Sequence, residues 1–259
     1  MAFVLLSMTD VVMGADIEIN ESNFPDAKFR DSLMDGYGED GILTEEEIAD
    51  ITDMNISDSE ISNLKGIEFF TALTTLDCRS NQLTTLDVSK NTSLTELNCS
   101  SNQLTTLDVS KNTSLTKLDC SFNQLTTLNV SKNTALESLD CAFSKLTTLD
   151  VSKNTALTEL NCSGNQLTRL DVSNNTSLTE LLCFSNQLAA LDVSKNTALK
   201  ILACFKNRIQ ENEMAKLIDS LPTVSKGAYE FARDTDSGEQ NVVTKELVAK
   251  AKKKGWSKL

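Results

Sequence analysis

The sequence predicts an α+β repeat protein, in which short strands from successive coils stack into one parallel sheet. Two observations predict this fold. The seven cysteines of the 259-residue chain follow one another every 21 residues, from Cys78 to Cys204, and the apolar residues around them recur at the same interval. Side chains that recur at a fixed period are the signature of a solenoid. The uniform interval also argues against a disulfide framework or a zinc cluster, whose cysteine spacings are uneven.

One repeat unit runs from Leu94 to Ser114 and reads LTELNCSSNQLTTLDVSKNTS. Its first half matches the leucine-rich-repeat template at every fixed position, so we predict a leucine-rich-repeat solenoid. A degenerate earlier coil is visible over residues 51–64. The solenoid should therefore hold about eight coils over residues 51–209, more than the three that stacking requires. The regular units begin at Leu73, Leu94, Leu115, Leu136, Leu157, Leu178 and Leu199.

Within a unit, Leu97 and Cys99 alternate with polar residues, a period of two that predicts a short strand with one buried face. Asn102 ends the strand, and its amide can satisfy the backbone where the chain turns. Ser144 replaces this asparagine in one coil, and we expect a local weakness there. We interpret the cysteines as buried thiols, because neighbouring parallel strands hold their β-carbons beyond disulfide distance. A redox or metal role is the alternative.

Two charged rows recur on the predicted outer side of the coils. Aspartates follow one another from Asp87 to Asp192, and lysines from Lys90 to Lys195. Stacked carboxylates about 5 Å apart would repel one another, and a lysine three positions on can offset this repulsion. We interpret both rows as solvated surface.

Both ends of a coil stack need a cap, because the core is otherwise exposed. We assign residues 16–50 to a helical N-terminal cap and residues 210–259 to an α/β C-terminal cap. The first cap resembles an EF-hand, with Asp40 and Glu47 at ligand positions, but Gly36 and Gly38 stand where two acidic ligands belong. A cap is therefore expected rather than a calcium site. Residues 1–15 indicate a signal peptide or its remnant, or else an apolar leader packed on the cap.

Composition argues against several classes of function. The chain has no histidine, which removes the commonest general base and zinc ligand. Residues 1–72 carry 17 acidic and 3 basic side chains, whereas residues 73–259 carry 20 acidic and 21 basic ones. Neither part has a basic stripe, so we expect no nucleic-acid binding. We also expect no membrane span, because no apolar run is long enough, and no metal or cofactor.

The repeat LxxLxCSxNQLTxLDVSKNTxL resembles the internalin-like and BspA-like leucine-rich-repeat proteins of bacterial surfaces. The segments FPDAKFR…DGILTEEEI and KGIEFFTALTTLDC are similar to the caps of that family, so the resemblance covers about residues 17–259. It implies a secreted or surface-displayed bacterial protein. It also implies recognition or adhesion through the concave face of the sheet.

The exposed template positions of the sheet turn apolar in the later coils, which predicts a binding patch there. The coil with Glu159 and Gly164 should interrupt this patch. We expect a non-catalytic recognition or adhesion module, a monomer that binds a protein or glycan. The alternative function is a self-associating scaffold. The phenylalanines could instead curl back over the strand ends or lie under the C-terminal cap. An enzyme is disfavoured, because paired carboxylates on an open sheet lie in no pocket. The predicted contact residues are Phe122, Phe143, Leu182, Phe184, Ile201 and Phe205.

Overall fold

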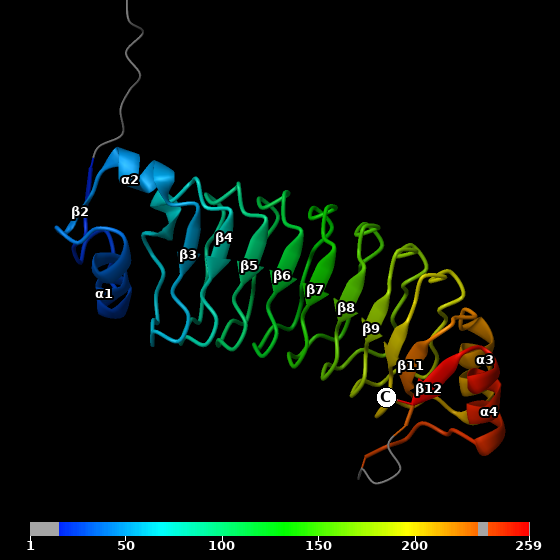
Figure 1. Ribbon diagram of the computed structural model, residues 1–259. Coiled ribbons are helices and arrows are strands. Elements are labelled where there is room, and N and C mark those ends of the chain that lie inside the picture. The colour runs from blue at the N-terminus through cyan, green and yellow to red at the C-terminus, as the bar shows by residue number, and fades with distance from the viewer. Residues whose placement is uncertain (1–15, 233–237, 259) are drawn as a thin grey trace, which may run out of the picture.

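The computed structural model describes residues 16–232 and 238–258, so the predicted signal peptide or leader lies outside the described residues. One ten-stranded parallel sheet runs along the described chain, with strand order β12-β11-β10-β9-β8-β7-β6-β5-β4-β3 (Figure 1). Each strand therefore pairs with the strands of the neighbouring coils, and turns close the coils on the other side. The predicted parallel-sheet solenoid is confirmed.

The repeat strands have three residues each and lie in register. Leu97 pairs with Leu76 on one side and with Leu118 on the other, so equivalent positions of each repeat form straight rows across the sheet. The strands are β3 (Asp53–Asn55), β4 (Thr75–Asp77), β5 (Glu96–Asn98), β6 (Lys117–Asp119), β7 (Ser138–Asp140), β8 (Glu159–Asn161), β9 (Glu180–Leu182) and β10 (Ile201–Ala203).

The core of each coil comes from the fixed positions of the repeat. In one coil the buried residues, all at most 8% exposed, are Leu94, Leu97, Cys99, Leu104, Leu107 and Val109. The same positions are buried in most other coils, with Leu86 only partly buried, and the buried residues form one continuous apolar cluster from Phe24 to Trp256. Burial of a large aliphatic side chain stabilises a fold by about 1.5–3 kcal/mol, so this cluster dominates the stability.

At the N-terminal end, β1 (Ile17–Glu18) pairs antiparallel with β2 (Ile42–Leu43) beside α1 (Ala27–Gly36) and α2 (Glu45–Asp50). Phe24, Phe29 and Leu33 are fully buried and belong to the common core. Asp40, a candidate EF-hand ligand, accepts a hydrogen bond from the Ile42 amide at 3.0 Å. A 3₁₀ turn, η1 (Ile67–Phe69), leads into the first regular coil.

At the C-terminal end, α3 (Glu211–Ser220) and α4 (Lys245–Lys253) lie beside two further strands, β11 (Gly227–Glu230) and β12 (Trp256–Lys258). The sequence did not predict β12, which extends the sheet by one more parallel strand. The segment boundaries assigned from the sequence stay predictions.

Two rows of asparagines bond adjacent coils together. Asn102 accepts from the Leu83 amide at 2.9 Å and donates to the Cys78 and Cys99 carbonyls, as predicted for this position. The row ends on Asn241 of the C-terminal segment, which accepts from the Ile209 amide at 2.9 Å. A second row, at Asn91, Asn112, Asn133, Asn154, Asn175 and Asn196, is fully buried and donates to carbonyls of the preceding coil.

The thiols and the outer aspartates have different surroundings. All seven cysteines are free and buried. The aspartates of this row are stabilised mainly by neighbouring serines, and the lysines contribute as well. Hydrogen bonds from the Ser89 side chain and amide lower the pKa of Asp87, and Lys90 contributes less. The sequence LDVS therefore forms its own tight turn at the aspartate.

Candidate binding surface

The four phenylalanines of the predicted patch lie just after the strands, at the C-terminal edge of the sheet. Phe122 and Phe143 have φ values of 52°, in the left-handed region. The equivalent residue of the other regular coils also has positive φ, as in Ser101, because the turn requires it. Phe184 and Phe205 stand one position earlier in their coils.

Exposure differs strongly among these four rings. Phe122 is 55% exposed and Phe143 is 41% exposed, whereas Phe184 is half-buried. Phe205 is only 4% exposed, so the expectation that it faces outward is wrong. It lies just after the last repeat strand, β10, where β11 of the C-terminal segment continues the sheet and leaves the ring little access to solvent.

The rings form a continuous row, which we call the aromatic ladder: Phe122, Phe143, Phe184 and Phe205. Phe122 stacks on Phe143 with centroids 4.6 Å apart, and Phe184 stacks on Phe205 at 4.5 Å. Phe143 also meets Phe184 edge-on at 6.1 Å. The predicted interruption at Gly164 is therefore wrong. A β-carbon at Gly164 would lie 2.5 Å from the Phe143 ring, so the missing side chain leaves the space that the ring occupies.

The two aliphatic residues of the predicted patch lie on the sheet itself. Leu182 is on β9 and Ile201 is on β10, and both are half-buried. Leu182 pairs in register with Ala203, and Ile201 with Glu180. These residues thus widen the apolar surface beside Phe184, while the most exposed aromatic area lies at Phe122 and Phe143.

Carboxylates occupy the solvent side of the sheet next to the aromatic ladder. Burial raises the pKa of Asp140, and Asp119 adds to this effect, although hydrogen bonds from Ala142 and Asn161 oppose it. Burial and the neighbouring Glu159 raise the pKa of Glu180. These are the paired carboxylates that the sequence suggested. They lie on the sheet face beside the aromatic ladder, in a chain without histidine.

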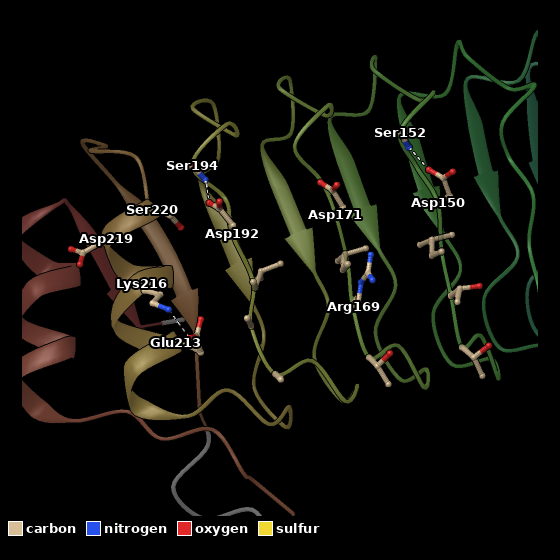
Figure 2. Close-up of a pocket in the computed structure, with 18 residues that line it drawn as sticks. Asp150, Ser152, Arg169, Asp171, Asp192, Ser194, Glu213, Lys216, Asp219 and Ser220 are labelled. Atoms are coloured by element: carbon tan, nitrogen blue, oxygen red, sulfur yellow. Dashed lines mark hydrogen bonds and ion pairs between the residues drawn. The ribbon is translucent and has the colours of Figure 1, made fainter.

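A groove of about 1380 Å³ lies on the other side of the coils, between their outer turns and α3 (Figure 2). Asp150, Asp171 and Asp192 line its coil side, and α3 contributes Glu213 and Lys216, which pair at 2.7 Å. Hydrogen bonds from Ser152 lower the pKa of Asp150, and hydrogen bonds from Ser173 lower the pKa of Asp171. The groove is thus lined by several acidic side chains.

Sequence reasoning missed this groove, although the repeat carries a signal for it. In most regular coils, two threonines follow the buried leucine after the strand, as Thr105 and Thr106 follow Leu104. The groove is where that pattern changes, to Arg169 in one coil and to Ala189 and Ala190 in the next. Departures from the consensus that gather on one surface therefore mark it without any structural information.

Comparisons with known proteins agree with this architecture. A model of leucine-rich repeats in two copies matches residues 92–133, and a model of the LVIVD repeat matches residues 162–185. Internalin J of Listeria monocytogenes is 44% identical over 71 residues, which are 27% of this chain and 8% of that protein. The chain thus spans less than a tenth of that relative.

Solved structures extend the similarity to most of the chain. The functional domain of InlJ from Listeria monocytogenes, described as including a cysteine ladder, has a TM-score of 0.59 and 32% identity. This match covers 85% of this chain and 62% of that one. Internalin C2 of the same organism has a TM-score of 0.73 over 79% of this chain and 95% of that one. Its 21% identity supports the fold alone.

The constant coil, the asparagine rows and the parallel sheet define a leucine-rich-repeat protein. In its repeat and its cysteine row, the chain is similar to the bacterial internalin-like leucine-rich-repeat proteins. Such proteins are generally interaction or adhesion modules and are typically not enzymes. No helix within the described part of the chain is long and apolar enough to cross a membrane.

Proposed function

We propose that this protein is a non-catalytic recognition or adhesion module that binds a protein or glycan partner on the sheet side of the solenoid. The contact centres on Phe122 and Phe143, with Phe184, Leu182 and Ile201 beside them. The protein acts as a monomer that is secreted or held at the bacterial cell surface. The resemblance to internalins supports this setting.

The observation that carries the proposal is the stacked, exposed pair Phe122 and Phe143. Two aromatic rings exposed by 55% and 41% on adjacent coils form an apolar patch that the solenoid core does not use. Both also occupy a backbone conformation that disfavours a bulky residue. Aromatic residues are enriched in interfaces, where they bury large areas with few rotatable bonds.

The test compares Phe122→Ser/Phe143→Ser with the parent protein on a glycan array and in pull-downs from mucus and extracellular-matrix extract. Ser101 already occupies the equivalent position, so the double variant should fold normally. We expect every specific ligand to be lost. Met34→Ser removes an exposed apolar side chain from α1 and should bind as the parent does. Unchanged binding by the double variant would refute the proposal.

A second variant tests the ladder without removing a ring. Gly164→Ser restores the serine of other coils, and its β-carbon would displace the Phe143 ring. We expect weakened binding with little change in the circular dichroism spectrum.

The alternative function is a self-associating scaffold. Light scattering after size-exclusion chromatography distinguishes a scaffold from a monomeric recognition module. A dimer that the double serine variant abolishes would favour the scaffold.

A further inference from the structure

The sheet face beside the aromatic ladder is acidic. From β6 to β9, the residues at and just before the exposed strand positions include five carboxylates and one lysine, Lys117. We call the five carboxylates the acidic band: Asp119, Glu137, Asp140, Glu159 and Glu180. Strand register brings Asp119 beside Asp140, and Glu159 beside Glu180. Like charges are thus directly opposite on adjacent strands, an arrangement that destabilises a sheet.

The protein itself does little to neutralise this band. Lys117 pairs with Glu96 at 2.7 Å, outside the band, and its charge acts more weakly on Glu137 and Glu159. Glu159 accepts a 3.2 Å hydrogen bond from the Ser138 hydroxyl. Among the described residues, no lysine or arginine lies within ion-pair distance of Glu159 or Glu180. Asp140 accepts from the Asn161 amide at 2.8 Å, a neutral donor. A cation from a partner would therefore relieve the repulsion that the free protein carries.

The charge is local rather than general. Residues 73–259 are nearly neutral as a whole, with 20 acidic and 21 basic side chains. The recurring lysines, such as Lys111, stand in the turn before each strand, at the opposite edge of the sheet from the phenylalanines. These lysines thus lie away from the acidic band, which faces the same side as the exposed rings.

The rings and the carboxylates are adjacent along the chain. Phe122 follows Asp119 by three residues, and Phe143 follows Asp140 by three. An arginine side chain combines the two contacts, because its planar guanidinium stacks on an aromatic face and also binds a carboxylate through two hydrogen bonds. A neutral sugar would use the rings but would leave the carboxylates without counter-charges.

We propose that the ligand of this surface is a basic protein segment, whose arginine or lysine side chains pair with the acidic band while its apolar parts cover Phe122 and Phe143. This inference rests on the proposed function and specifies the partner. Charge complementarity of this kind accelerates association and selects against acidic partners.

The experiment uses a short fluorescent peptide that alternates arginine with serine, and the same peptide with citrulline in place of arginine. Citrulline keeps the shape but removes the charge. The test variant is Glu159→Gln/Glu180→Gln. The matched control, Asp87→Asn/Asp108→Asn, removes two charges from the outer row, where Asn129 already occupies the position in one coil.

We expect the arginine peptide to bind and the citrulline peptide to fail. The Kd of the arginine peptide should rise about tenfold or more in the glutamine variant, a loss of about 1.4 kcal/mol, and less than about twofold in the control. Equal weakening in both variants would indicate diffuse attraction to an acidic protein and would overturn the inference. So would equal binding of the two peptides.

The same variants separate this inference from the proposed function. If a ligand found on the array or in the extract is lost in Phe122→Ser/Phe143→Ser but retained in Glu159→Gln/Glu180→Gln, the basic partner is wrong and the recognition surface stands. If neither double variant changes the binding of any ligand, the proposed function itself fails.

Discussion

Phe122 and Phe143 hold a left-handed backbone conformation that costs a residue with a β-carbon about 1–2 kcal/mol. The coil geometry imposes this conformation, because serine, glycine or lysine adopts it in the other regular coils. At 55% exposure, the Phe122 ring buries less than half of its surface. The two rings are thus placed against the local preference of the turn, which fits a role outside folding.

Replacement of a buried ring and of an exposed ring should therefore change the free energy of unfolding by very different amounts. Phe205→Ser removes a buried ring, and we expect the free energy of unfolding to fall by about 3–5 kcal/mol. Phe122→Ser should leave it nearly unchanged, since Ser101 occupies the equivalent turn. Urea denaturation followed by circular dichroism measures both. A similar loss in the two variants would show that Phe122 belongs to the core.

Ser144 is a second residue at which one coil departs from its neighbours. Its hydroxyl is buried without a hydrogen-bond partner, whereas Asn165 in the next coil bonds to the Leu146 amide and to the Cys141 and Cys162 carbonyls. The weakness predicted from the sequence therefore has a structural cause.

Ser144→Asn should restore the missing bonds, to the Leu125 amide and to the Cys120 and Cys141 carbonyls. A net hydrogen bond contributes about 0.5–1.5 kcal/mol, so we expect a gain of about 1 kcal/mol or more. The urea midpoint should rise with an unchanged slope. A lower midpoint would mean that this turn is too narrow for the amide.

At the scale of elements, the N-terminal helix is tied to the first coil through one carboxylate. Asp26 caps α1 by accepting from the Lys28 and Phe29 amides at 2.9 and 3.1 Å. Its other oxygen accepts from the Ser62 amide and hydroxyl and from the Asn63 amide. Partial burial alone would raise the pKa of Asp26, but these hydrogen bonds outweigh burial and lower it below 3.8.

A lowered pKa in the folded state means that Asp26 stabilises the protein above its unfolded pKa, and that this contribution is lost as the pH falls through the folded value. We expect Asp26→Asn to cost about 1–2 kcal/mol at pH 7. Below pH 3.8 the difference from the parent should shrink. Hydrogen exchange of α1 and denaturation at both pH values measure this. If the difference in free energy of unfolding between variant and parent does not change with pH, the ionised carboxylate is not its source.

The elements differ in how far the sequence determines them. The strand β5 was predictable because Leu97 and Cys99 alternate with polar residues in every copy. The strands β1 and β12 were not, because two or three residues carry no periodic signal and depend on tertiary pairing. The exposure of Phe122 and Phe143 agrees with the repeat pattern, and their contact with a partner stays a prediction. Its continuity across Gly164 and the burial of Phe205 depend on ring orientations and on the C-terminal segment, which the repeat pattern does not encode.

At the scale of the whole molecule, the seven buried thiols form one titratable system. Burial raises the pKa of Cys78 from 9.0 to about 12, and it raises that of Cys120 and the other cysteines as well. The folded state therefore keeps its thiols protonated, while the unfolded state releases its protons near pH 9. A group with a raised folded pKa contributes stability that is present below its unfolded pKa and lost as the pH rises.

Because every regular coil carries one buried thiol, the free energy of unfolding should fall steeply at alkaline pH. Each ionising thiol lowers the free energy of unfolding by about 1.4 kcal/mol per pH unit, so seven lower it by about 10 kcal/mol per pH unit. A typical domain has only about 5–15 kcal/mol in total. Under reducing conditions we therefore expect unfolding within about one to two pH units above pH 9, with about seven protons released. Cys120→Ala/Cys141→Ala should lower the number of protons released by about two, even though the cavities that it creates shift the pH midpoint of unfolding. A transition that releases only one or two protons would mean that single coils open independently, and the solenoid would then not be one cooperative unit.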